Sequence, residues 1–159
     1  MENEKLIQAT KTFETFCKML DNQEWRYGSS QEDLLITTKV RGDDFPIDLR
    51  ILVDAERLLV RLHSPLPFEV SSERIPDMAL AVCCINDSLV DGTFDLNIEN
   101  GSIVFRITTT FRESLISEEA FDFFLGFAVH VVDRYGIKLF MIAKEMFTTQ
   151  QLLEEIKNS

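Results

Sequence analysis

The apolar residues of this chain change their spacing from helical to strand-like and back again. Between residues 6 and 20 they recur every three or four positions, which is typical of one face of an amphipathic helix. Between residues 34 and 62 they recur every second position, and short turn-forming segments separate the runs. The pattern predicts an N-terminal helix followed by an antiparallel meander of four strands, with Trp25 and Tyr27 on the first strand.

The last two strands of the meander fit a tight hairpin. A turn at residues 55–56 pairs Val53 with Leu58 and keeps apolar residues on one face. The same register places Arg50 opposite Arg61 on the outer face, where like charges destabilise a sheet unless another group answers them. Either this strip accepts an acidic segment of a partner, or nearby carboxylates neutralise it locally, which is the commoner arrangement on protein surfaces. The carboxylates that could do so are Asp48, Glu32 and Glu69.

We expect Pro65 and Pro67 to end the meander, and a second helix to follow it. This helix would be capped by Ser71 or Ser72 and would tolerate Pro76 in its first turn. Its predicted inner stripe consists of Ile75, Met78, Ala79, Val82, Cys83, Asn86 and Leu89.

The second hairpin has the clearest local signal in the chain. The Asn-Gly pair at residues 100–101 is typical of a two-residue turn with positive φ at both positions. That register places Leu96 opposite Phe105 on the apolar face and Asp95 opposite Arg106 on the polar face.

A third helix, capped by Ser117, is unusually apolar. Ten of the thirteen residues between positions 120 and 132 are apolar, which is more than one buried stripe needs. Phe123 and Phe127 lie off the predicted stripe, so the surplus requires a second cover. The stripe itself consists of Phe121, Phe124, Leu125, Ala128, Val131, Val132 and Tyr135.

The second cover could be the C-terminal segment or a second subunit. Gly136 is placed to end the third helix. Thr148 and Gln151 then form the capping box of a last short helix. The C-terminal residues that could provide the cover are Ile137, Phe140, Met141 and Ile142.

These elements predict an α+β fold made of one domain, residues 1–159. The antiparallel sheet, a meander plus a hairpin, carries the helices packed on one face, in the order α-ββββ-α-ββ-α plus short C-terminal helices.

The charge balance excludes several classes of partner. Acidic residues outnumber basic ones 27 to 16, which gives a formal net charge of −11. Such a field repels nucleic acid and anionic lipid, and it attracts cationic partners.

The sequence shows no sign of export or membrane insertion. The N-terminus does not resemble a signal peptide, no apolar run is long enough to span a bilayer, and the three cysteines are an odd number. We therefore expect reduced thiols and a cytoplasmic location.

Few residues offer catalytic or metal chemistry. Asp133 lies three residues after His130 and could orient it, but the sequence ties no nucleophile to His130 or to His63. Adjacent helical residues point about 100° apart, so Cys83 and Cys84 do not share a metal or a bridge. We expect Cys83 to fill the core and Cys84 to be half exposed. The sequence therefore predicts no enzyme, and no catalytic, cofactor-binding or metal-binding residues.

From Met78 to Tyr135 the order of landmarks resembles that of the YbjN family of bacterial proteins, over somewhat more than a third of the chain. The order of elements is also similar to that of the type III secretion chaperones, small acidic dimers that hold a client in extended form. The resemblance implies a secretion-chaperone-like fold, brings no catalytic residues, and suggests a regulatory or chaperone-like role. The landmarks are Leu80, Asn86, Gly92-Thr93-Phe94, Gly101, Phe105, Ser117-Glu118-Glu119, Phe121, Asp133 and Tyr135.

Together these observations predict a non-enzymatic protein-binding module of chaperone-like or regulatory type, acting as a homodimer that holds a protein client or partner. An extended client could add to a sheet edge, either the strand of Trp25 and Tyr27 or the hairpin strand at residues 103–107. The alternatives are a small-molecule sensor with a phenylalanine-lined pocket and an accessory subunit of a larger assembly. The candidate partner or dimer surface comprises Trp25, Tyr27, Phe123, Phe127, Arg50 and Arg61.

Overall fold

The computed structural model of the chain describes residues 2–159. Its helices and strands follow one another along the chain in the order that the spacing of apolar residues predicts. In chain order the described elements are α1 (Glu2–Asn22), β1 (Tyr27–Ser30), β2 (Leu35–Arg41), β3 (Pro46–Asp54), β4 (Leu59–Glu69), the 3-10 helix η1 (Ser72–Arg74), α2 (Ile75–Ser88), β5 (Thr93–Leu96), β6 (Ser102–Thr110), α3 (Glu118–Ala143) and α4 (Thr149–Lys157).

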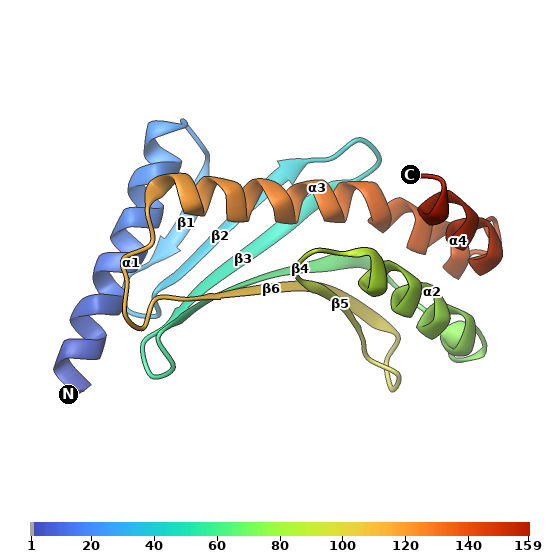
Figure 1. Ribbon diagram of the computed structural model, residues 1–159, viewed down its shortest axis with the longest axis horizontal. Coiled ribbons are helices and arrows are strands. Elements are labelled where there is room, and N and C mark those ends of the chain that lie inside the picture. The colour runs from blue at the N-terminus through green and yellow to red at the C-terminus, as the bar shows by residue number, and fades with distance from the viewer. Residues whose placement is uncertain (1) are drawn as a thin grey trace.

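The strands form one six-stranded antiparallel sheet in the order β1-β2-β3-β4-β6-β5 (Figure 1). A row of apolar residues crosses its inner face, in which Ile36 pairs with Ile51, Ile51 with Leu62, and Leu62 with Ile107. All four are buried, and burial of each such side chain stabilises the fold by roughly 1.5–3 kcal/mol. The predicted α+β class, with a meander followed by a hairpin, is confirmed.

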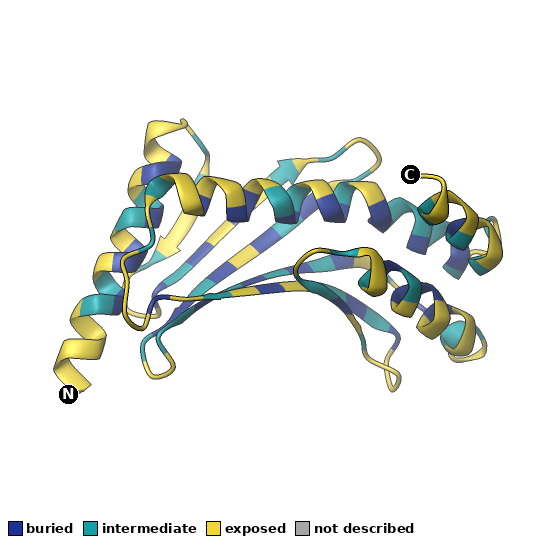
Figure 2. Ribbon diagram, in the orientation of Figure 1, coloured by how far each residue is buried: buried dark blue, intermediate teal, exposed yellow. Residues whose placement is uncertain are grey.

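The helices lie on the inner face of the sheet, with α1 at one end, α2 and α4 at the other, and α3 running between them (Figure 1). Phe16 of α1 packs on Phe121 at the start of α3, with ring centroids 4.2 Å apart. At the far end, Arg74 Nη2 donates a hydrogen bond of 3.1 Å to the carbonyl oxygen of Ile142. Figure 2 shows α3 alternating between buried and exposed bands, as an amphipathic helix on a sheet requires.

The β3–β4 register differs from the predicted one by two residues. Val53 pairs with Val60 and Ile51 with Leu62, so the loop contains four residues instead of two. Its last residue, Leu58, has a left-handed φ of 55°, a conformation that usually signals glycine or asparagine. A shift of two preserves the buried face, so the face is correct and the predicted cross-strand partners are wrong.

The same shift separates Arg50 from Arg61, which the sequence analysis wrongly placed opposite each other. Arg50 lies opposite His63, and Arg61 lies opposite Leu52. Arg61 is paired with the carboxylate of Asp54, which accepts a hydrogen bond from Arg61 Nη2.

The second hairpin is shifted by two residues as well. Phe94 pairs with Phe105, not with Ile107, and the loop comprises residues 97–101. Only Gly101 in this loop has a positive φ, of 74°. The predicted two-residue turn is therefore wrong, although the glycine does occupy the left-handed position that it was assigned.

Pro65 and Pro67 do not end the meander, because both lie inside β4. The pairing of β3 with β4 ends at Arg50 and His63, whereas β4 pairs with β6 from Leu59 to Glu69, with a register shift between Pro65 and Glu69. A proline nitrogen, which has no hydrogen to donate, is tolerated on the unpaired side of a strand.

The buried side of α2 also differs from the predicted stripe. Ala79 and Cys83 are exposed, and Cys84 is half-buried, so the expectation that Cys83 fills the core is wrong. The helix contacts α3, α4 and β5, and these neighbours select a different sector of its surface. Ser71 precedes η1, but its side chain makes no capping hydrogen bond. The buried residues of α2 are Met78, Ala81, Val82 and Ile85.

Helix α3 continues through Gly136 to Ala143, so the predicted helix end is wrong. Gly136 is buried against Phe45, and a Cβ added to it would lie 2.5 Å from Phe45 Cζ. The glycine therefore allows a close approach between α3 and the β2–β3 loop. The predicted caps of α3 and α4 are confirmed, since Ser117 Oγ accepts from the amide of Ala120 and a capping box begins α4. The predicted cap of α2 is wrong, because Arg74, and neither Ser71 nor Ser72, precedes that helix.

The two edge strands are β1 and β5. The strand at residues 103–107, predicted as an edge, lies inside β6, between β4 and β5. At β5, Asn86 of α2 takes the place of a neighbouring strand: its Nδ2 donates to the Phe94 carbonyl at 3.0 Å, and its Oδ1 accepts from the Phe94 amide at 2.8 Å. This side chain protects β5 from pairing with another chain.

Candidate functional site

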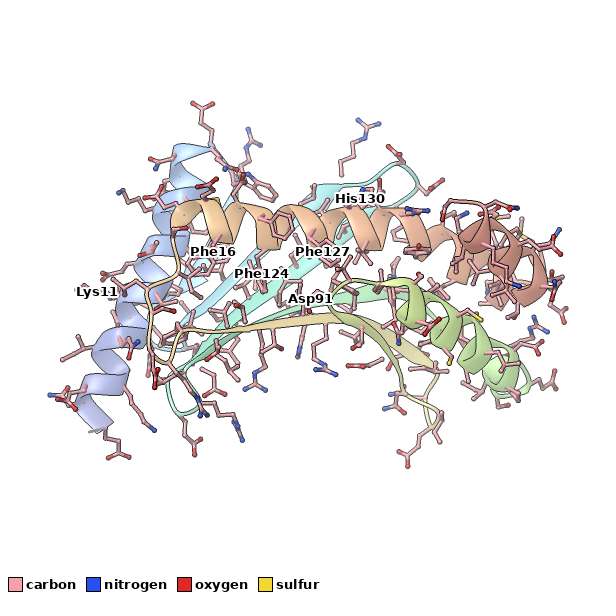
Figure 3. The ribbon with its side chains drawn as sticks, in the orientation of Figure 1. Lys11, Phe16, Asp91, Phe124, Phe127 and His130 are labelled. Carbon is pink, nitrogen blue, oxygen red and sulfur yellow. The ribbon has the colours of Figure 1, made fainter. Side chains whose placement is uncertain are left out.

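An apolar groove of about 800 Å³, the α3 groove, lies beside the first half of α3. Helix α3 forms one wall, β6 contributes its floor, and the loops before β5 and before α3 close its ends. Figure 3 shows Phe124 and Phe127 on α3, with Asp91 on the loop below them. The lining residues are Val90, Asp91, Ile107, Thr109, Ile116, Ser117, Glu119, Ala120, Phe123, Phe124 and Phe127.

Two phenylalanines that lie off the buried stripe of α3 dominate the groove. The rings of Phe123 and Phe127 stack with centroids 6.3 Å apart and an interplanar angle of 20°. Phe123 is 76% exposed, whereas Phe124, on the core side of the same wall, is 7% exposed. The sequence analysis singled out this pair as needing a second cover, and the pair does lie at one surface.

The C-terminal segment is not that cover. Residues 137–143 continue α3 along its own axis. Helix α4 packs against α2, where Thr149 Oγ1 donates to the Asp77 carbonyl oxygen at 3.3 Å. Phe123 therefore remains open to solvent in the described residues, whereas Phe127 is half-buried and packs partly against the core.

The groove combines apolar walls with an acidic rim. Val90 is 95% exposed at one end, and Phe123 is 76% exposed on the wall formed by α3. Asp91 and Glu119 contribute carboxylates to the lining. Contiguous exposed apolar side chains with a polar rim are typical of binding sites.

Trp25 and Tyr27 lie away from the groove, where β1 meets the end of α1. The Tyr27 hydroxyl donates to Asp21 Oδ1 at 2.8 Å, and burial together with this hydrogen bond raises the pKa of Tyr27. Trp25 Nε1 donates to Gln23 Oε1 at 3.1 Å. Both rings also pack against the core, so these contacts hold β1 in place.

Arg50 and Arg61 lie on the outer face of the sheet, opposite the helices. Asp54 joins this face to the β3–β4 loop: its side chain is 8% exposed and accepts from the Arg57 amide at 2.8 Å, from Arg57 Nη1 and from Arg61 Nη2. Burial opposes ionisation of Asp54. The hydrogen bonds from Arg57 and the charges of Arg61 and Arg57 outweigh it and lower the pKa of the carboxyl.

We expect Asp54→Asn to lower the free energy of unfolding by about 2 kcal/mol at neutral pH, because hydrogen bonds to buried charged groups stabilise by that order. Since the folded-state pKa of Asp54 lies below its unfolded value of 3.8, its contribution is present above pH 3.8 and is lost as the pH falls through the folded-state pKa. Urea unfolding at neutral pH and well below pH 3.8 measures both quantities.

Asp48→Asn is the matched control, because Asp48 makes an exposed ion pair of 3.1 Å with Lys39. Its loss should cost less than about 1 kcal/mol. If the difference between Asp54→Asn and wild type is the same at both pH values, the Asp54 charge is not the stabilising feature.

The predicted pairing of His130 with Asp133 does not form. Asp133 Oδ1 accepts from the Asp43 amide at 2.8 Å, and no hydrogen bond joins Asp133 to His130 within residues 2–159. His130 is exposed on α3. Throughout the described residues, no group of three His, Cys, Asp or Glu side chains is arranged to hold a metal ion. Across the same residues, no helix is both long and apolar enough to cross a membrane.

The comparisons with known proteins agree with the fold. A family model described as "Putative bacterial sensory transduction regulator" matches residues 12–140, a span that contains all six described strands. The chain belongs to the YbjN family. The YbjN resemblance deduced from the landmarks between Met78 and Tyr135 is therefore confirmed, and the family description indicates a regulatory module.

A solved structure shares the YbjN fold over most of the chain. The crystal structure of YbjN from E. coli, described as "a putative transcription regulator", superposes with a TM-score of 0.56 at 13% sequence identity and covers 91% of each chain. At this identity the likeness shows the fold alone. No curated protein matches the sequence.

Proposed function

We propose that this YbjN-family protein is a non-enzymatic regulatory module that binds an apolar, positively charged segment of a partner protein in the α3 groove. The observation that carries the proposal is the exposed ring of Phe123, stacked on the half-buried Phe127 beside an apolar groove of about 800 Å³. The family description supports a regulatory role. The three free cysteines support a cytoplasmic site of action.

The charge of the groove favours a cationic segment. Asp91 and Glu119 belong to the groove lining, and Asp122 precedes Phe123 on α3. The whole chain carries a formal charge of −11, which steers basic partners toward it. A suitable segment is an amphipathic helix whose apolar residues, three or four positions apart, enter the groove while its Lys or Arg residues face the rim.

The test uses a fluorescent amphipathic peptide of leucine and lysine as the probe, with binding followed by anisotropy. Phe123→Ser should weaken binding at least about tenfold, because aromatic anchors at the centre of an interface carry most of its energy. Binding should also weaken with salt. Ile98→Ser is the matched control: Ile98 is 71% exposed on the β5–β6 loop, outside the groove lining. Equal losses for both variants would contradict the proposal.

The homodimer predicted from the sequence would use the same phenylalanines. Two copies with the same negative charge repel each other, and for this reason we favour a basic partner. Sedimentation velocity on wild type and Phe123→Ser separates the two cases. A wild-type dimer that becomes monomeric in the variant would identify the second copy as the occupant.

A small-molecule sensor is the second candidate, because a volume of about 800 Å³ lies in the range of ligand sites. A thermal-shift screen of metabolites distinguishes it. One compound that saturably raises the melting temperature of wild type, and not that of Phe123→Ser, would favour a sensor.

A further inference from the structure

The outer face of the sheet carries a row of directly opposed polar residues, which we name the outer-face row: Arg50, His63 and Arg106. His63 on β4 lies opposite Arg50 on β3 and opposite Arg106 on β6. Neighbouring strands are about 4.8 Å apart, so the row spans roughly 10 Å perpendicular to the strands. Side chains ending in nitrogen project beneath β4 and β6, away from the helices (Figure 3).

Carboxylates neutralise the positive charge of this row only in part. Arg106 Nε contacts Asp95 Oδ2 at 2.7 Å on the diagonal, where the predicted ion pair forms even though the two residues are not directly opposed. Within residues 2–159, Arg50 makes no ion pair and no side-chain hydrogen bond. In the same part of the chain, the buried atoms His63 Nε2 and Arg61 Nε lack a hydrogen-bond partner.

Burial and the charges of Arg61, Arg106 and Arg50 together lower the pKa of His63, while Asp95 acts in the opposite direction. Three of the four charged side chains that act on the imidazole are therefore positive. This local excess of cationic side chains contrasts with the net charge of −11 on the whole chain. Arg50 and Arg106 lie on β3 and β6, one on each side of His63, so a negative charge bound over β4 would interact favourably with both.

One apolar pair borders the row on each side, while Arg61, hydrogen-bonded to Asp54, and Asp48, ion-paired with Lys39, occupy other positions beside the row. Leu35 pairs with Leu52 two positions along one side, and Pro65 pairs with Val104 two positions along the other. All four are half-buried. The face thus offers a polar, positively charged centre with a short apolar strip on each side, Leu35–Leu52 and Pro65–Val104. Each strip lies about 7 Å from the row along the strands.

We infer that the outer-face row binds an extended acidic segment of a protein, whose carboxylates contact Arg50 and Arg106 while its apolar side chains lie on the flanking strips. Side chains on one side of an extended chain repeat at about 7 Å, so two carboxylates span the row. Arginine guanidinium groups bind carboxylates in paired hydrogen bonds. This surface lies on the opposite side of the sheet from the α3 groove, and the inference stands independently of the function proposed there.

A peptide fits this face better than a nucleic acid or a free phosphate. A polyanionic backbone would extend over the acidic surface beyond the row, where the net charge of −11 repels it. The side chains of the row come from three neighbouring strands, and the row's width of roughly 10 Å is more than a single phosphate can bridge. The flanking strips add apolar contacts that neither ligand would use.

The chain contains only two histidines, which makes the test direct. The probe is a synthetic peptide in which glutamate alternates with valine, and the imidazole signals are followed by NMR across a pH titration. The peptide should raise the titration midpoint of His63 by about one pH unit, because a nearby opposite charge favours the protonated form. His130, which is exposed on α3, serves as the internal control, and its imidazole signals should not change when the peptide is added.

Arg50→Glu should weaken peptide binding at least about tenfold and abolish the His63 shift. Lys11→Glu is the matched control, because it changes the net charge equally and lies on the exposed side of α1 (Figure 3). Phe123→Ser should leave this binding unchanged.

Several results would overturn the inference. Equal weakening by Lys11→Glu would show a response to net charge alone. Inorganic phosphate that reproduces the His63 shift would indicate a small-anion site, and an oligonucleotide that binds more tightly than the peptide would identify a different class of partner. A glutamine–valine peptide that binds equally well would remove the role of charge.

Discussion

Replacing Gly101 by valine is expected to lower the free energy of unfolding by about 3 kcal/mol or more. Gly101 has a φ of 74°, and a β-branched residue in this left-handed region costs on the order of 1–3 kcal/mol. An added Cβ would also lie 2.0 Å from the Val70 carbonyl oxygen. The clash would break the hydrogen bond of 2.9 Å from the Val70 amide to the Gly101 carbonyl oxygen, which ties the β5–β6 loop to the end of β4.

Urea unfolding followed by circular dichroism measures this loss, and Gly126→Ala provides a matched control. Gly126 lies exposed within α3, and an added Cβ would meet no atom within 4 Å. Alanine there should stabilise the protein by about 0.5–1 kcal/mol, because glycine is the poorer residue inside a helix. An unchanged unfolding midpoint for Gly101→Val would contradict the contact with Val70.

The faces of the sheet could be predicted from the sequence, whereas the cross-strand partners could not. Alternation assigns Val53 and Val60 to the buried face in any register that differs by two residues. The register itself depends on loop length, and the β3–β4 loop is closed by Leu58 in a left-handed conformation. Leucine carries no turn signal. Here it is tolerated because its side chain packs against the core.

Contacts between distant segments could not be predicted from the sequence either, because local patterns do not show which segments the fold brings together. Gly136 resembles a helix end when only its neighbours are considered. Its actual role depends on Phe45, which is far from it in the chain and is brought against α3 by the β2–β3 loop. The amide of Asp43 in that loop donates to Asp133 on α3 at 2.8 Å, so one loop explains both positions.

The candidate site was predictable only in part. Phe123 and Phe127 could be identified because they fall off the helical stripe of α3. The other groove residues, including Ile107 and Ile116, come together through the tertiary fold, and no local pattern marks them. Val90 carries the one local signal among them, because it is an apolar residue inside a turn segment, where polar residues are usual.

The two faces of α3 should respond differently to the loss of a phenylalanine ring. Phe121→Ala is expected to lower the free energy of unfolding by about 3–5 kcal/mol, because Phe121 is fully buried and its removal leaves a cavity. Part of the loss is the ring contact with Phe16 at 4.2 Å, and such pairs contribute about 0.5–1.5 kcal/mol beyond their buried area. Urea unfolding at neutral pH provides the comparison.

Phe123→Ala, two positions along the same helix, should change the free energy of unfolding by less than about 0.5 kcal/mol, because Phe123 is 76% exposed. This variant would then separate binding from folding, since it removes a groove anchor and leaves the core intact. A large loss that grows with protein concentration would show instead that a second copy covers Phe123. In that case the groove would be an interface between two copies, and the basic partner proposed for it would be wrong.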